Sequence, residues 1–572
     1  MLVKGLNFKG TIALDNRFVE GNRGVNDLFN DTQQKYIDPV TGLATYTKEY
    51  DTANRFDFQE GIKWSSSSGQ VNNNDTFRRL FYQAQLNYSI NLNSDHDITA
   101  MGLFNRNETA QGSEVPNYRE DWVFRTTYSY KGKYFAEYNG AYNGSEKFSK
   151  ENRFAFFSSG GLSWIVSKEG FMEKTSSFLD LFKVRLNYGE IGDDNVRERW
   201  LYMDRWAFGG QSQLGTSGEA AELSPYTWYR EAAIGNINVK WEQVKKSNVG
   251  VDYGFFKGLI TGSFDYFKED RSDILLTGDR RAVPSYYGAK APVANLGRVT
   301  NAGYEIELKL NHTFANGFNL WSEMNMTHSK NKIIFSDQPS LLPEYQKNEN
   351  KPIGQYNSHV GHGYYNTWDE LYASTIHDTN DSQKLPGSYN LLDYNADGVI
   401  DVKDNIPYGY SGTPQNTYNA TVGFNWKNFS AFVQFYGVNN VTRQVVLNSL
   451  SSQNHVVYDQ GSLWSKDNTN ADVPMPRWLS VPSGYNDAQR HMYDGSYVRL
   501  KNAEIAYTFD SSNSLIKSMG IQNVRVFLNG DNLYLWSKMP DDRESNYAGT
   551  GWASQGAYPT VKRFNLGANI IF

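Results

Sequence analysis

Apolar and polar residues alternate along many segments of the chain with a period of two, which is the pattern of a β-strand with one face in an apolar environment. The last segment is the clearest, and one of its faces carries Phe564, Leu566, Ala568, Ile570 and Phe572. The same alternation occurs upstream at 82–90, 134–142, 249–255 and 418–426. About sixteen such segments have the length of roughly ten residues that a tilted membrane-spanning strand requires.

Short and long connections alternate between these segments. The short or modest ones are 92–95, 131–133, 169–178, 256–258, 312–317, 426–429 and 510–520. The long ones are 19–75, 108–117, 144–152, 190–239, 272–294, 335–414, 442–491 and 539–559. Outer-membrane barrels have short periplasmic turns and long extracellular loops. The pattern therefore predicts an all-β fold, a transmembrane antiparallel β-barrel of the outer membrane, and disfavours a large soluble all-β protein.

Composition agrees with a barrel. The 572 residues include 39 Tyr, 33 Phe and 14 Trp, yet the mean hydropathy is −0.62, as expected when only alternate strand residues face lipid. No run approaches the ~18 apolar residues of a membrane-spanning helix. The net charge of −6 comes with no basic stripe and disfavours nucleic acid as a partner. Cysteine is absent, which excludes disulfides and thiolate chemistry.

Several stretches have a specific family signature. They are KYFAEYNGAYNGSEKF (133–148), RFAFFSSGGLSWIVSKEGF (153–171), LFKVRLNYGEIGDDN (181–195), NINVKWEQVKKSNVGVDYGFFKGLITGSFDYFKEDRSDIL (236–275), NLGRVTNAGYEIELKL (295–310), DGSYVRLKNAEIAYTF (494–509) and FLNGDNLYLWSK (527–538). Together they resemble the SusC/RagA family of TonB-dependent transporters of Bacteroidetes, in order and through nearly the whole chain. The resemblance implies a barrel of about 22 strands, preceded by a plug and a TonB box and covered by a SusD-like lipoprotein lid.

The chain is therefore expected to be the C-terminal portion of such a barrel, with no separate soluble domain and with the plug and TonB box outside it. The segment Met1–Leu6 has no basic region, apolar region or cleavage site of a secretory signal, so we expect a fragment or one half of a split protein. The expected partners are a SusD-like surface lipoprotein, a plug-bearing N-terminal segment or chain, the TonB complex acting through that segment, and outer-membrane lipid. Sixteen strands closing alone into a porin-sized barrel are the alternative.

The segment from Asp393 to Asp404 has the spacing of an EF-hand calcium loop, with Gly398 at the position of the sharp turn. The candidate Ca²⁺ ligands are the side chains of Asp393, Asn395, Asp397, Asp401 and Asp404 and the backbone carbonyl of Val399. A hard cation needs several oxygens that converge on one point. Asx turns that order the loop without a metal are the alternative. In the predicted topology the motif lies in an extracellular loop, which Ca²⁺ would stiffen.

Aromatic residues gather in three of the long connections. They are Trp200, Tyr202, Trp206, Tyr226, Trp228 and Tyr229 in 190–239, Tyr364, Tyr365 and Trp368 in 335–414, and Trp464 and Trp478 in 442–491. Aromatic faces stack on sugar rings and also bury well in protein interfaces. The sequence leaves three roles open: contact with a glycan or peptide substrate, contact with the lipoprotein lid, and packing of the loops against one another.

No catalytic motif is present. The eight His are scattered, and His359 and His362 are the one close pair, so solvated or hydrogen-bonded loop histidines are expected in place of a metal site. The sequence has no nucleophile elbow, phosphate loop or dinucleotide fingerprint. We expect a protein that is not an enzyme but a TonB-dependent importer of an oligosaccharide or peptide. A passive porin or surface-binding barrel is the first alternative, and a secreted soluble β-protein that binds or cleaves polysaccharide is the second.

Overall fold

The computed structural model describes residues 4–18, 20–21, 35–37, 40, 44–46, 70–71, 75–196, 198–213, 223–445, 462–472, 474–475, 482–485, 488–510, 518, 520–539 and 560–572. Among these, sixteen strands form one antiparallel sheet in which each strand pairs with the next along the chain. In order they are β1 (Leu6–Arg17), β6 (Phe77–Leu92), β7 (His96–Gln111), β8 (Asn117–Tyr130), β9 (Tyr134–Ser145), β10 (Phe154–Ile165), β11 (Leu179–Asp193), β14 (Glu242–Phe255), β15 (Ile260–Leu276), β16 (Ala294–Thr313), β17 (Asn319–Phe335), β24 (Asn416–Trp426), β25 (Phe429–Asn439), β28 (Tyr497–Asp510), β29 (Asn523–Ser537) and β30 (Arg563–Ile571).

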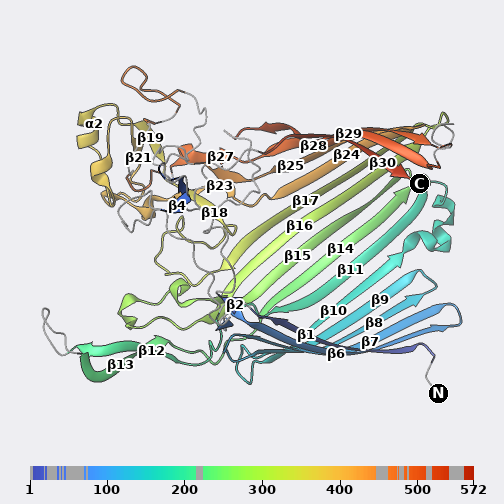
Figure 1. The fold of residues 1–572 in the computed structure, drawn as a ribbon, viewed down its shortest axis with the longest axis horizontal. Helices are drawn as coiled ribbons and strands as arrows, with labels where there is room; N and C mark the ends of the chain where they lie inside the picture. The colour runs from blue at the N-terminus through green and yellow to red at the C-terminus, as the bar shows by residue number, and fades with distance from the viewer. Residues whose placement is uncertain are drawn as a thin grey trace.

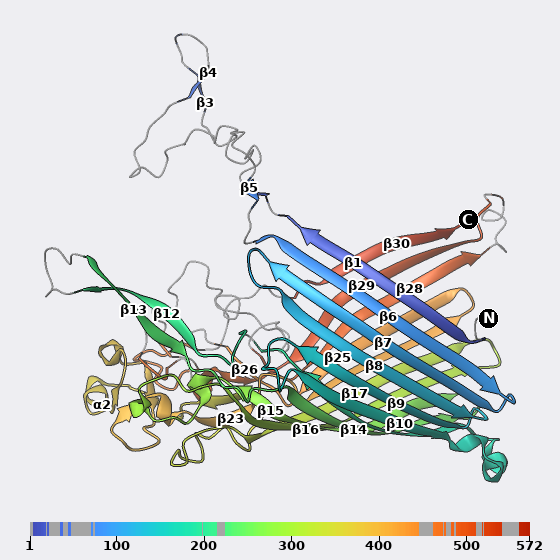
Figure 2. The ribbon, with the colours of Figure 1, turned by 90° about the horizontal axis from the view of Figure 1, so that it is seen from below.

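Figures 1 and 2 show this sheet bent into a trough with β1 and β30 along its two rims. In the described residues β1 pairs with β6 and β30 pairs with β29, and these two rim strands do not pair with each other. The antiparallel sheet of sixteen strands predicted from the alternation is confirmed, and it is not closed. No helix in the described part of the chain has the length and apolar character needed to cross a membrane.

The two faces of the sheet differ as the alternation predicts. On β9, Tyr134, Tyr138 and Tyr142 lie on one face and are 42%, 48% and 46% exposed. Glu137 and Asn139 lie between them on the opposite face, which is the concave one, and hydrogen-bond to each other. We call the apolar face the outer face and the polar face the inner face.

The two ends of the sheet also differ, as Figure 1 shows. At one end, the turn end, connections are short: Lys131 and Gly132, with φ of 52° and 58°, make a tight turn between β8 and β9, a conformation matched to the twist of a hairpin. Both termini lie at this end. The opposite end, the loop end, carries the long connections, so the predicted alternation is confirmed.

Short elements occupy the connections. They are β2 (Glu20–Gly21), β3 (Lys35–Ile37), β4 (Ala44–Tyr46), β5 (Gln70–Val71), η2 (Val166–Lys168), η3 (Gly170–Thr175), β12 (Arg205–Gln213), β13 (Leu223–Ala233), η4 (Gly278–Arg280), η5 (Ser285–Tyr287), β18 (Gln355–Ser358), β19 (Gly361–Tyr364), α2 (Trp368–Tyr372), β20 (Ile376–His377), η6 (Asp381–Gln383), β21 (Tyr389–Leu391), β22 (Val399–Ile400), η7 (Val402–Asp404), β23 (Ile406–Ser411), β26 (Thr442–Gln444), η8 (Gln489–His491) and β27 (Met492–Asp494).

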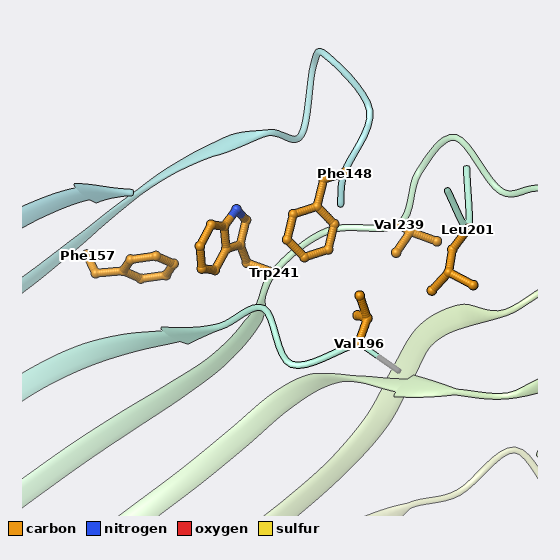
Figure 3. Close-up of a cluster of buried hydrophobic side chains, with 6 residues drawn as sticks. All are labelled: Phe148, Phe157, Val196, Leu201, Val239 and Trp241. Carbon is orange, nitrogen blue, oxygen red and sulfur yellow. The ribbon is translucent and has the colours of Figure 1, made fainter. Parts of the chain in front are cut away.

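The two larger buried clusters of the described residues order the loop end. The first is shown in Figure 3 and contains Phe148, Phe157, Val196, Leu201, Val239 and Trp241. The indole N–H of Trp241 donates to the Arg153 carbonyl at 3.2 Å. The second cluster contains Tyr389, Leu391, Ile400, Tyr485 and Ala488. It lies within the unit formed by β18–β23 and the described residues between 482 and 491, which we call the loop body.

Candidate functional site

The Asp-rich segment 393–404 is part of the loop body and forms a series of side-chain-capped turns. The Asp393 carboxylate accepts from the backbone N–H of Asp397 at 3.2 Å and of Gly398 at 2.8 Å. The Asn395 side-chain oxygen accepts from Asp397 N–H at 2.8 Å. Gly398 has φ of 89°, a conformation that L side chains rarely adopt. The predicted sharp turn is therefore present at Gly398.

Asp404 is fully buried and joins the two ends of the segment. One of its oxygens accepts from the N–H groups of Tyr394 at 2.8 Å and Asn395 at 3.2 Å. The other accepts from Asp401 N–H at 2.8 Å and completes a capping box at the start of η7. Through three charge-assisted hydrogen bonds, the Asp404 carboxylate links the backbone at 394–395 to the backbone at 401. We call this link the Asp404 staple.

Lys403 supplies a cation within the same segment. Its ammonium lies 2.9 Å from Asp401 and 3.4 Å from Asp397, two of the predicted calcium ligands. Side-chain hydrogen bonds to these two carboxylates raise the pKa of Lys403. Within the described part of the chain, no group of three or more His, Asp or Glu side chains is arranged to hold a metal ion. Calcium binding at 393–404 stays a prediction, and it requires Lys403 to move away.

Three histidines of the loop body, His359, His377 and His491, are buried, whereas His362 is exposed. His359 Nε2 lies 2.9 Å from the Asp401 carbonyl, and His377 Nδ1 lies 2.7 Å from the Ser483 carbonyl. Burial lowers the pKa of His377, and burial together with the nearby Arg490 charge lowers that of His491 to about 4. The hydrogen bonds of His359 and His377 join segments that are distant in sequence.

The hairpin of β12 and β13 presents aromatic side chains on both faces and projects from the loop end (Figures 1 and 2). Trp206 and Phe208 are two residues apart on β12, and Phe208 contacts Tyr229 across the hairpin at a ring separation of 5.9 Å. All three are 60% exposed or more. Trp228 lies on the other face, against the backbone of Gly209. This hairpin is the most exposed group of predicted contact residues in the described part of the chain.

The other predicted aromatic contacts are placed differently. Tyr365 is buried in the loop body. Trp464 is buried against it, and its indole donates to the Asn366 side-chain oxygen at 3.0 Å. Tyr202 and Tyr364 are partly buried, whereas Trp200 and Trp368 are exposed. The side chain of Tyr226 and the whole of Trp478 lie outside the described residues. Loop packing therefore accounts for Tyr365 and Trp464, and surface contact stays open for Trp200 and Trp368.

The inner face carries ion pairs that the sequence pattern did not reveal. Arg185 donates to both Asp252, at 2.7 Å, and Asp265, at 2.9 Å, across three neighbouring strands. The three residues come from β11, β14 and β15, and 80 positions separate Arg185 from Asp265. The polar positions of the alternation indicate this face, but only the register of the strands identifies the partners.

Comparison with known proteins finds that the chain is similar to TonB-dependent receptors. No protein-family model matches it. TonB-dependent receptor P3 of Formosa agariphila is 28% identical over 478 residues, which cover 78% of this chain and 45% of that protein. TonB-dependent receptor SusC of Bacteroides thetaiotaomicron is 25% identical over 463 residues, which cover 78% of this chain and 43% of that protein. The match thus spans less than half the length of these curated relatives.

Solved structures share the fold. The structure of the RagAB peptide transporter superposes with a TM-score of 0.60 and 16% identity, over 86% of this chain and 56% of that one. The RagAB peptide importer in its open-open state superposes with a TM-score of 0.63, over 87% and 55% of the two chains. At this identity the likeness shows the architecture of the barrel wall.

Proposed function

We propose that this chain, which belongs to the SusC/RagA family of TonB-dependent receptors, forms part of the wall of an outer-membrane importer. The observation that carries the proposal is the two-faced sheet of sixteen strands, with an apolar outer face and a polar inner face. Such a wall separates lipid from an aqueous lumen. Import of an oligosaccharide or peptide through that lumen is the function that the family and the wall support best.

Energy coupling and the lid are parts of the same proposal. A plug-bearing segment or chain would fill the lumen, and the TonB complex would act through it. A SusD-like lipoprotein would cover the loop end, where the exposed face of the β12–β13 hairpin offers Trp206, Phe208 and Tyr229 for contact with the lid or with substrate. Ca²⁺ bound at 393–404 would stiffen the loop body near that lid.

A passive pore made by these sixteen strands alone has less support. In the described residues β1 and β30 leave their outward edges unpaired, and unpaired backbone groups facing lipid cost several kcal/mol each, as an order of magnitude. Additional strands between β1 and β30 would satisfy those groups. The open sheet therefore favours a larger barrel over a self-closed porin.

Uptake measurements in the native host test the proposal. Cells that carry or lack the gene would be supplied with labelled oligosaccharides and peptides, with and without a protonophore or depletion of TonB. We expect uptake of at least one ligand class to require the gene, the proton gradient and TonB together. Gene-dependent uptake that survives loss of TonB would contradict energy coupling and support a passive pore.

Mass spectrometry of the protein purified from native outer membrane tests the partners. We expect a surface lipoprotein and plug sequence to co-purify with peptides of this chain. Recovery of this chain without either would contradict the proposed assembly.

A further inference from the structure

A cavity of about 910 Å³ opens on the inner face at the loop end of β15, β16 and β17. Arg271, Val299 and Ile333 lie side by side in its wall, since each pairs with the next across the three strands. The connections 277–293 and 336–354 complete the cavity above the sheet. Its position on the inner face places it beside the path of any molecule that passes through the barrel.

Internal contacts hold the two covering connections together. The Arg281 guanidinium donates to the Asp337 carboxylate at 2.6 Å and to the Pro292 carbonyl at 2.8 Å. Gly278 packs so closely under the Ala291 carbonyl that a Cβ atom would lie 2.3 Å from that oxygen. These contacts form without a ligand, so the cavity is largely preorganised.

The cavity has an excess of positive charge. Five cationic side chains line it, namely Arg271, Arg280, Arg281, Arg298 and Lys351, against three acidic ones, Glu269, Asp279 and Asp337. Two of the cations have carboxylate partners: Arg271 pairs with Asp193 and Glu242, and Arg281 pairs with Asp337. Among the described residues, no carboxylate lies within 4.0 Å of the other three cationic groups.

Those three groups, on Arg280, Arg298 and Lys351, differ in how they are held. The Arg298 guanidinium lies 5.7 Å from the centre of the Phe335 ring. The Lys351 ammonium donates to the Tyr345 carbonyl, and burial lowers its pKa. Arg280 is exposed at the end of η4. Glu344 and Asp279 act on Lys351 and Arg280 from a distance, but within the described part of the chain none of the three cations is held in an ion pair. Cations that are not held in ion pairs, in a concave site, are favourable partners for an anion.

The neutral side chains of the wall add hydrogen-bond donors. The amide oxygens of Asn301, Asn331 and Gln338 accept hydrogen bonds from Ser329, Ile353 and Asn348 respectively. Their NH₂ groups are the ends that remain for a ligand, and these groups donate. A surface of cations and donors fits a ligand rich in acceptor oxygens, as a charged sugar is.

We propose that this cavity binds the carboxylate or sulfate groups of an anionic oligosaccharide, through Arg280, Arg298 and Lys351. The inference rests on the proposed import function and gives it a substrate class. Arginine forks match carboxylate and sulfate geometry, and the amide donors match the sugar hydroxyls beside each charged group. The site lies on the inner face, so it would hold the charged sugar at the entrance to the lumen.

Direct binding tests the proposal. The protein, purified in detergent from native outer membrane with its accompanying chains, would be titrated calorimetrically with four probes. These are an oligogalacturonate, a sulfated galactan oligosaccharide, a neutral galactan oligosaccharide of the same length, and a glutamate-rich peptide. We expect an anionic oligosaccharide to bind, more weakly as salt is raised because the charges are screened, and the neutral one to bind at least about tenfold more weakly.

Variants assign the binding to the cavity. Arg280→Gln combined with Arg298→Gln should weaken anionic oligosaccharide binding by about tenfold to a hundredfold, and Lys351→Gln should weaken it further. Lys174→Gln, in η3 at the turn end, removes one positive charge far from the cavity and should leave binding unchanged. Heat-modifiable migration on gels would verify that each variant is a folded barrel, and Arg298→Lys retains the charge if the double variant does not fold.

Four results would overturn the inference: unchanged binding in the cavity variants, equal binding of the neutral oligosaccharide, binding of the acidic peptide alone, or binding of no probe. Failure of import is distinguishable from failure of this site. TonB-dependent uptake of a neutral ligand, without anion binding, would support the import function and contradict the anionic substrate class. Anion binding that depends on the cavity residues, together with uptake that does not require TonB, would support the anion site and contradict energy coupling.

Discussion

The sixteen-stranded wall and the loop body belong to one chain, but the outer face of the wall is suited to lipid and the loop body to water. On the outer face of the wall, Leu566 is 79% exposed and Val249 is 48% exposed. In the loop body, Ile400 and Tyr485 are 0% and 1% exposed, and the Asp404 carboxylate is buried with them. Lipid supplies the apolar surroundings of the wall, whereas the loop body must make its own core in water. A charge introduced at an exposed position should therefore be costly on the outer face of the wall and tolerated on the surface of the loop body.

A charge on the outer face should produce the largest effect. Val249 lies in the middle of β14, and Val249→Arg should destabilise the barrel by about 2–4 kcal/mol, because a charged side chain near the bilayer midplane is poorly solvated. Denaturant titration in lipid vesicles, followed by heat-modifiable migration, would measure the loss. Tyr372→Arg, at an exposed position of α2, is the control and should change stability little. An equal loss in both variants would contradict the assignment of the outer face to lipid.

Acid should weaken the loop body and spare the wall. The pKa of His491 is about 4 in the folded state and about 6.5 when unfolded. The unfolded state therefore binds a proton first as pH falls, and stability is lost between about pH 6.5 and 4, by up to about 3 kcal/mol. Hydrogen exchange measured by mass spectrometry at pH 7.5 and 4.5, corrected for intrinsic rates, should show added opening in the loop body.

His491→Gln is the matched variant for this pH effect. It removes the titrating group, so opening of the loop body should depend less on pH, with the remaining dependence due to His377, whose pKa is also lowered by burial. An unchanged pH dependence in His491→Gln would exclude this histidine as the cause.

Loss of the Asp404 charge should loosen the loop body by about 2 kcal/mol. In the parent protein, backbone N–H groups donate to the Asp404 carboxylate. Asp404→Asn keeps the shape of the side chain but turns an NH₂ group, itself a donor, toward some of these donors. Faster hydrogen exchange at Tyr394, Asn395 and Asp401 would be the signature. Asp378→Asn, at an exposed position, is the control. Normal protection in Asp404→Asn would show that the Asp404 staple is dispensable.

Substitution of Lys403 should have the smallest effect of these variants, and the effect would be on the affinity for Ca²⁺. If Ca²⁺ binds at 393–404, Lys403→Gln should tighten binding by roughly twofold to fivefold, because an exposed ammonium that competes for Asp397 and Asp401 is removed. Calorimetric titration with Ca²⁺ would measure the change, with Lys347→Gln as the control. Absence of Ca²⁺ binding in both the parent protein and Lys403→Gln would leave Asx turns as the whole role of the motif.

The sequence alone determined the wall. Strand positions, the assignment of Tyr134 and Glu137 to opposite faces, and the alternation of short and long connections all follow from a period-two pattern. That pattern is local: each residue's face is set by its neighbours in the same strand. The turn at Gly398 was likewise predictable, since a glycine at that spacing reports a backbone conformation. The calcium motif was equally visible in the sequence. The sequence did not show that Lys403 pairs with two of the predicted ligands or that Asp404 is buried and bonded to backbone N–H groups.

Only the tertiary structure decided which residues meet. The Arg281–Asp337 pair that covers the cavity joins positions 56 residues apart, and Arg185 reaches Asp265 across 80. The burial of Tyr365 and Trp464, against the exposure of Trp206 and Tyr229, was equally hidden, because aromatic residues in loops look alike in sequence. Strand register and loop packing bring distant residues together, and no local period encodes those distances. The wall was therefore evident from the chain, while the cationic cavity emerged only when the chain was folded.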